Sequence, residues 1–357
     1  MLSFFQFDFV SYREAVNYLG SKTRILELCN QIGGRIVICP DWNGNVMTST
    51  CDGIDGNSFG LINVNAIDAG KTDWLYNSYG GEDQLIFFPE SGEFVIDSMP
   101  QHPVVRMRRS VRLNAVHGNH VEFDLIRTVR LLERYEIHEA FGDAAAVSLD
   151  QMDVSLVGFV TTNSIVNNVI HSPSRIPPVS IQIRGMFNSG QSMAAVIPFQ
   201  PAEDPKLEVP IDTNFFGSSP HGRLRYLPAA ALLRTDGKYR CQVTVPHERA
   251  KPFLGTLDFR GGTLTLVTFD ILELPYSDEL KQEVRAYNHG PTFPGETDFA
   301  QFYEFNIYSQ IRKWSHGETR TFHQYTLHIN ADNRTLTYLV REVLGVEYEQ
   351  VYEKMMR

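Results

Sequence analysis

The sequence has 357 residues, of which 43% are hydrophobic and 21% are charged. This is the balance of an ordinary globular protein, with enough apolar material for a large core. The net charge is −10 at pH 7 and there is no lysine-rich arm, so a nucleic-acid partner is not expected.

Cysteine spacing, apolar runs and missing motifs argue against metal-binding, cofactor-binding and membrane-spanning proteins. The four cysteines, at positions 29, 39, 51 and 241, form no CxxC pair, and the Walker A, GxGxxG, HExxH and GxSxG motifs are absent. We therefore expect no cofactor and no metal.

No run approaches the roughly 18 apolar residues of a membrane span, so no membrane partner is expected. The N-terminus carries Asp8 and lacks the basic region of a signal peptide, which predicts a soluble cytoplasmic protein; the alternative is a periplasmic or secreted protein whose leader has been removed.

The first predicted element is a short helix at about residues 11–20. Ser11 and Glu14 have the spacing of a capping box, in which each side chain satisfies a free backbone N–H group of the first turn. Gly20 is expected to end this helix, because glycine readily adopts the left-handed conformation that follows a helix.

A long series of short strands follows, separated by Gly, Asn and Pro turns. The basic stretch 104–112 alternates like a strand, and we interpret it mainly as a solvent-exposed strand face. A second helix, at about 335–344, has apolar residues at helical spacing and closes the series. The other predicted strands lie at 24–29, 34–40, 45–51, 121–131, 179–187, 193–200, 239–246, 264–274, 302–310 and 321–329.

The order of these elements predicts the fold class. Strands do not alternate with helices, so a Rossmann-type parallel sheet is not expected. No internal repeat and no low-complexity linker divides the chain. We predict a mainly β fold of large antiparallel sheets, stacked or closed into a barrel, with a short helix at each end and a single domain over residues 1–357.

One basic residue lies on an apolar strand face. In the predicted strand 121–131, Arg127 is in phase with the apolar positions Val121, Phe123, Leu125, Val129 and Leu131. A charge on such a face must be paired or must point into a wet cavity. Arg127 is therefore a candidate for binding a substrate.

Three polar groups could carry chemistry. Glu82 and Asp83 follow Gly80-Gly81, in what is either a tight turn or the rim of a polar cleft. Arg249 and Lys251 share one face of an extended segment with His247, which suits recognition of carboxylates or hydroxyls, although a solvated strand end explains them equally well.

The third group contains Asn288, His289 and Glu304. Asn288 and His289 lie in a polar Asn-His-Gly-Pro turn. Glu304 lies between Tyr303 and Phe305 and should face the opposite side of its strand. Such a lone carboxyl either faces solvent or has a perturbed pKa that suits general acid–base catalysis.

Several of these stretches resemble an uncharacterised bacterial family. The stretches are GRIVICPDWNGNVMTSTCDGIDGNSFGLIN at 34–63 and NSYGGEDQLIFFPESGEF at 77–94, with later matches that include YNHGPTFPG and FYEFNIYS. The resemblance covers about residues 10–345. That family is similar to the galactose mutarotase-like superfamily, which implies a β-supersandwich with a carbohydrate cleft on a concave face. The superfamily includes aldose 1-epimerases, polysaccharide lyases and domains of glycoside hydrolases, so the fold implies a carbohydrate but not one reaction.

The resemblance also implies roles for individual residues. Glu304 stands where aldose epimerases carry the base that acts on the anomeric hydroxyl. Thr213 stands where their acid, a histidine, is expected, so His221 or His289 would have to supply the acid from another loop. Gln84 replaces an arginine of the family pattern, and a tryptophan of that pattern is also missing.

Three hypotheses remain open. The first is a carbohydrate-active enzyme, an epimerase, lyase or hydrolase, in which Glu304 is the base and Arg127, Arg249 and Lys251 bind hydroxyls or a uronate. The second is a non-catalytic sugar-binding module that has lost the acid. The third is a structural β protein with solvated acidic turns.

Overall fold

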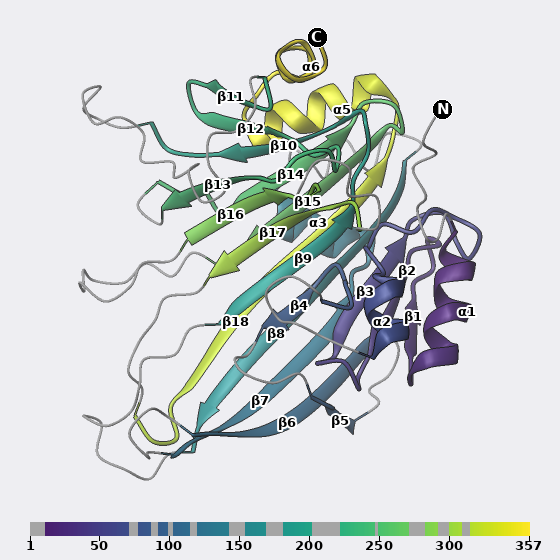
Figure 1. Ribbon diagram of the computed structural model, residues 1–357, viewed down its shortest axis with the longest axis vertical. Coiled ribbons are helices and arrows are strands. Elements are labelled where there is room, and N and C mark those ends of the chain that lie inside the picture. The colour runs from purple at the N-terminus through teal and green to yellow at the C-terminus, as the bar shows by residue number, and fades with distance from the viewer. Residues whose placement is uncertain are drawn as a thin grey trace.

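Antiparallel β-sheets of ten, five and three strands make up most of the molecule in the computed structural model (Figure 1). The structure describes residues 11–70, 78–86, 92–98, 103–114, 120–142, 154–168, 181–201, 222–246, 249–270, 283–291, 300–308 and 315–357. The mainly β class and the large antiparallel sheets predicted from the sequence are confirmed.

The ten-stranded sheet is the largest of the three sheets, and its strands come from most of the length of the chain. In spatial order it consists of β11 (Leu224–Leu227), β12 (Ala230–Arg234), β10 (Met193–Pro198), β14 (Phe253–Asp258), β15 (Thr263–Phe269), β18 (Thr319–Asn330), β8 (Ser155–Asn167), β7 (His120–Leu131), β6 (Val104–Asn114) and β5 (Val95–Ser98).

The five-stranded sheet lies against one face of the ten-stranded sheet. Its order is β13 (Cys241–Pro246), β16 (Glu283–Asn288), β17 (Phe302–Tyr308), β9 (Gln182–Asn188) and β4 (Gln84–Ile86). Buried residues of both sheets, among them Phe159 of β8, Leu254 of β14 and Phe305 of β17, belong to one hydrophobic core. The two sheets therefore form a sandwich whose interior is apolar.

Strand β17 shows how the sequence separates the two faces of the five-stranded sheet. Tyr303, Phe305 and Ile307 belong to the sandwich core. Because side chains alternate along a strand, Glu304 and Asn306 point to the opposite, outer face, as the sequence predicts for Glu304. This alternation places polar chemistry outside the sandwich.

Helices cover the other face of the ten-stranded sheet. They are α3 (Arg134–Phe141), α5 (Asn333–Leu339), the π-helix η2 (Val340–Leu344) and α6 (Tyr348–Met356), and they share a second core with residues such as Leu266 of β15 and Leu327 of β18. The predicted closing helix at 335–344 corresponds to α5 and η2. Helix α6 was not predicted, although Val351 and Met355, at spacing i, i+4, face the core.

The N-terminal part forms a small layer of its own, at the right of Figure 1, with helices α1 (Tyr12–Lys22) and α2 (Val64–Ala69) and the sheet of β1 (Leu26–Cys29), β2 (Arg35–Cys39) and β3 (Asn45–Thr50). The capping box of Ser11 and Glu14 is confirmed. Gly20 does not end the helix, because the chain stays helical to Lys22 and Thr23 is the C-cap, with its N–H donating to the Leu19 carbonyl. In the part of the chain that the structure describes, no helix is long and apolar enough to cross a membrane.

Candidate functional site

Polar side chains gather on the outer face of the five-stranded sheet. Cross-strand register determines which residues share this face with Glu304. Its partners are Met186 of β9 and Tyr287 of β16. Two residues further along, Asn306 is paired with Arg184 and Arg285, and Arg184 is in turn paired with Gln84 of β4. Four neighbouring strands therefore contribute to one polar surface.

Glu304 is the carboxyl group at the centre of this surface. Only 9% of the residue is exposed, and its Oε2 accepts a hydrogen bond of 2.9 Å from Asn306 Nδ2. Burial raises the pKa of Glu304, while the positive charge of Arg184 and the hydrogen bond from Asn306 oppose the rise. A raised pKa brings a carboxyl group closer to the range in which it can give and take a proton, which is what general acid–base chemistry requires.

His289 stands beside the same surface, directly after β16. Its Nδ1 is 2.7 Å from the hydroxyl of Tyr287, and its ring stacks on Phe302 with centroids 4.4 Å apart. Tyr287 is the direct cross-strand neighbour of Glu304. The structure thus brings an imidazole–phenol pair to the strand next to the carboxyl group, and this pair could relay or supply a second proton.

Arginine side chains flank Glu304 on the outer face. Arg184 donates to Gln84 Oε1 at 3.3 Å, and Gln84 Oε1 also accepts from the Ser78 hydroxyl at 2.6 Å. Arg285 donates to the Tyr308 hydroxyl at 3.2 Å and lies over the Tyr308 ring. Guanidinium groups of this kind bind sugar hydroxyls or carboxylates through paired N–H donors.

Sequence reasoning singled out Glu304 and His289 on this face but missed Arg184, Tyr287, Arg285 and Asn306. Two of these residues, Asn306 and Tyr287, could have been predicted from their spacing to Glu304 and His289. Asn306 is two residues from Glu304, and Tyr287 is two residues before His289, so period-two spacing puts each on the same face. Arg184 could not have been predicted in this way, because only the register of β9 against β17 brings it there.

Glu82 lies beneath the surface, away from any rim. It has no exposed area, and its carboxylate accepts from the Ser49 amide at 2.5 Å, from the Ser49 hydroxyl at 2.8 Å and from His328 Nε2 at 2.9 Å. The preceding Gly80 has φ +95°, and a Cβ there would lie 2.1 Å from the Leu61 carbonyl oxygen. The two glycines thus let the backbone approach another segment of the same chain, which favours the turn interpretation.

Asp83 and Arg127 form a fully buried ion pair. Arg127 Nη2 is 2.6 Å from Asp83 Oδ1, and neither side chain is exposed. Arg127 also donates to Asn163 Oδ1 at 2.6 Å, while Asp83 Oδ2 accepts from Thr161 and Gln324. Of the two alternatives that the sequence leaves for Arg127, a partner or a wet cavity, the structure shows the partner. In this arrangement the two charges bind each other.

The remaining predicted site residues lie elsewhere. The side chain of Asn288 accepts from the Gly237 amide and donates to the Tyr239 carbonyl, so it holds a turn together. Arg249 donates to the Gln200 carbonyl at 2.8 Å and lies over the Phe199 ring. Lys251 is half-buried just before β14. His221, like Thr213, lies outside the described residues.

Metal binding has no support among the residues described. In those ranges, no three His, Cys, Asp or Glu side chains are grouped so as to hold an ion. The described residues bring carboxyl, imidazole, phenol and guanidinium groups to the outer face.

Comparisons with known proteins agree with this architecture. The model of a family of unknown function, DUF6786, matches residues 10–102 and 95–355. The Slr1438 protein from Synechocystis sp. PCC 6803 superposes with a TM-score of 0.53 at 12% identity, covering 87% of this chain and 96% of that one. A protein described as a candidate aldose 1-epimerase from Escherichia coli K12 superposes with a TM-score of 0.51 at 9% identity, covering 85% and 98% of the two chains. No curated protein sequence matches. The fold is that of the galactose mutarotase-like proteins.

Proposed function

Because the chain belongs to DUF6786, a family of unknown function, and has the galactose mutarotase-like fold, we propose that it binds a carbohydrate on the outer face of its five-stranded sheet, with Glu304 at the centre. The observation that carries this proposal is the setting of Glu304. Its carboxyl group is nearly buried, has a raised pKa and lies between Arg184 and the Tyr287–His289 pair.

The proposed chemistry is proton transfer to or from the bound sugar. Glu304 would take or give a proton at the anomeric hydroxyl, at a ring carbon or at the glycosidic oxygen, and the Tyr287–His289 pair would act as the opposite partner. Arg184 and Arg285 would hold hydroxyls or a carboxylate of the sugar. These roles fit an epimerase, a lyase or a hydrolase, and the epimerase is favoured by the description of the Escherichia coli neighbour.

A non-catalytic sugar-binding module is the second candidate. The observation that favours it is Thr213, which occupies the position of the epimerase acid in the sequence resemblance. A module of this kind would use the same outer face and would need Arg184 and Asn306 for hydrogen bonding rather than Glu304 for proton transfer.

Binding and turnover can be measured separately. A panel of neutral and acidic sugars is screened by thermal shift, and each sugar that binds is followed by NMR for a change in its anomeric or ring signals. Glu304→Gln keeps the shape of the side chain but removes its ionisable proton. We expect this variant to bind the sugar and to lose at least about a hundredfold of any turnover, since one general acid–base group contributes that much.

The controls separate the two candidates. Glu353→Gln makes the same chemical change on the exposed side of α6 and should alter neither binding nor turnover. Binding without product in the unaltered protein selects the binding module. The proposal fails if no sugar binds, or if Arg184→Met and Glu304→Gln both leave binding and turnover unchanged.

A further inference from the structure

A separate cavity opens at the edge of the sandwich. Its volume is about 590 Å³, within the range of small-molecule sites. Tyr303 and Phe187 line it from the core-facing sides of β17 and β9, whereas Glu304 points to the outer face. The five-stranded sheet thus separates the cavity from the face proposed above.

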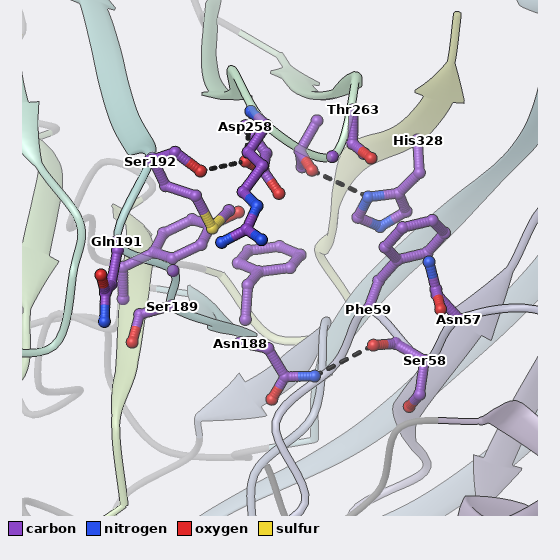
Figure 2. A pocket seen from close by; sticks show the side chains of 17 residues that line it. Asn57, Ser58, Phe59, Asn188, Ser189, Gln191, Ser192, Asp258, Thr263 and His328 are labelled. Carbon is purple, nitrogen blue, oxygen red and sulfur yellow. Dashed lines mark hydrogen bonds between the residues drawn. The ribbon is translucent and has the colours of Figure 1, made fainter. Parts of the chain in front are cut away.

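The base of the cavity is a chain of hydrogen bonds through His328. Its Nδ1 is 2.9 Å from the Thr265 hydroxyl (Figure 2). Its Nε2 donates to the Glu82 carboxylate at 2.9 Å. A carboxylate can only accept, so Nε2 carries a proton, and in the neutral ring Nδ1 accepts from Thr265. Thr265 also hydrogen-bonds to the Tyr303 hydroxyl, so one lone pair of its oxygen remains to accept from a ligand hydroxyl.

The walls are aromatic. Phe59 stacks on the His328 ring with centroids 4.2 Å apart and an interplanar angle of 10°, and Phe187 stacks on Tyr303 at 5.2 Å. Phe59 is partly exposed and is held in place by its stacking on His328, so it offers a rigid aromatic surface to a ring-shaped ligand, whereas Phe187 and Tyr303 are 1% exposed and close the cavity on its core side.

The rim carries short amide and hydroxyl side chains together with one acid and one base. Asp258 accepts from the Ser192 hydroxyl at 2.7 Å and from the Arg260 amide at 3.0 Å. Asn188 Nδ2 donates to the Ser58 carbonyl at 3.0 Å, which leaves its oxygen available as an acceptor. Asp258 and Arg260 oppose each other in charge at the rim, and the Glu82 carboxylate lies next to His328 at the base, so the cavity offers no excess of positive charge to an anionic ligand.

We propose that this cavity is a second carbohydrate site, which takes a neutral sugar of one or two rings. The Phe59 ring matches the apolar face of a sugar ring, the rim amides and hydroxyls match its hydroxyl groups, and the Thr265 oxygen accepts from a hydroxyl at the base. The proposal stands on residues that the Glu304 site does not use, so either site can exist without the other.

The test uses the full-length chain labelled with ¹⁵N in its histidines, with the His328 signals assigned by His328→Asn. Neutral mono- and disaccharides and glucuronate are added in turn. A neutral sugar should shift the His328 ring nitrogens, because it hydrogen-bonds to the Thr265 oxygen that faces them. Asn57→Trp adds a large ring at the mouth from an exposed position and should weaken this binding by at least about tenfold.

Two further variants make the test decisive. Gln191→Trp, also exposed at the rim, gives a second block should Asn57→Trp disturb folding. Thr321→Trp, an exposed position about 23 Å along β18 from His328, is the matched control and should leave binding unchanged. Glu304→Gln should also leave it unchanged, which separates this result from the proposed function. The proposal is overturned if no neutral sugar of the panel shifts His328, if only glucuronate does, or if both blocked variants bind as before.

Discussion

Among single residues, Glu304 shows how a strand position can give a carboxyl group an unusual environment. Its neighbours in the chain, Tyr303 and Phe305, are core residues, and their burial fixes the direction in which Glu304 must point. Its register partners, Met186 and Tyr287, are themselves buried. The raised pKa therefore follows from packing, and it is only partly offset by Arg184 and Asn306.

This environment predicts how stability changes with pH. A carboxyl group whose pKa is raised by folding binds its proton more tightly in the folded state. Its stabilising contribution is present below the unfolded pKa of about 4.3 and is lost as pH rises through the folded value. Glu304→Gln cannot ionise and therefore avoids this loss, so the variant should gain stability over the unaltered protein as pH rises above about 4.3. Urea unfolding at several pH values measures the gain, and a gap that is constant or shrinks with pH would contradict it.

Among single elements, helix α1 depends on its first turn. The hydroxyl of Ser11 accepts from the Glu14 amide at 3.3 Å, and the Glu14 carboxylate accepts from the Ser11 amide at 3.4 Å. Tyr12, Ala15 and Leu19 then bury the inner side of the helix against the N-terminal layer. The cap positions this apolar side, because it fixes where the helix begins.

Loss of the cap should destabilise the N-terminal layer. Ser11→Ala removes the acceptor for the Glu14 amide and should lower the free energy of unfolding by about 1 kcal/mol. Ser21→Ala is the matched control, since its hydroxyl donates to the Tyr18 carbonyl within the last turn and caps nothing. Urea unfolding compares the two, and equal effects would show that the cap does not stabilise this helix.

In the whole molecule, the short segment Glu82–Asp83 joins all three sheets. Glu82 binds Ser49 of β3 in the three-stranded sheet and His328 of β18 in the ten-stranded sheet. Asp83 binds Arg127 of β7. The chain then continues directly into β4 of the five-stranded sheet. The buried charges thus hold the layers in one arrangement.

Removing half of the ion pair should weaken the whole assembly. Arg127→Met leaves the Asp83 carboxyl buried without its cation and should cost about 3–5 kcal/mol of unfolding free energy. The double variant with Asp83→Asn should recover a large part of that loss, because no uncompensated charge remains. If Arg127→Met unfolds within about 1 kcal/mol of the unaltered protein, the ion pair contributes no more than an exposed pair and the prediction is wrong.

The fold could be predicted from the sequence more completely than the residues of the candidate site. Period-two alternation located β7 and β17, and it put Arg127 on an apolar face and Glu304 on the opposite one from its aromatic neighbours. Strand β8 was missed, because its buried polar residues Thr161 and Asn163 break the apolar pattern. The partners of Asp83 come from residues 127, 161 and 324, and no local pattern relates positions so far apart. The roles of His221 and Thr213 stay predictions.

The alternation in β17 also has a consequence for protein engineering. Its odd-numbered positions carry the aromatic and aliphatic groups that hold the sandwich together, and the even-numbered positions Glu304 and Asn306 carry the outer polar groups. A combinatorial library that varies only 182, 184, 285, 304 and 306 would therefore sample new ligand preferences while leaving every core contact of these strands in place. In these strands, the residues that stabilise the fold alternate with the residues that could determine ligand preference.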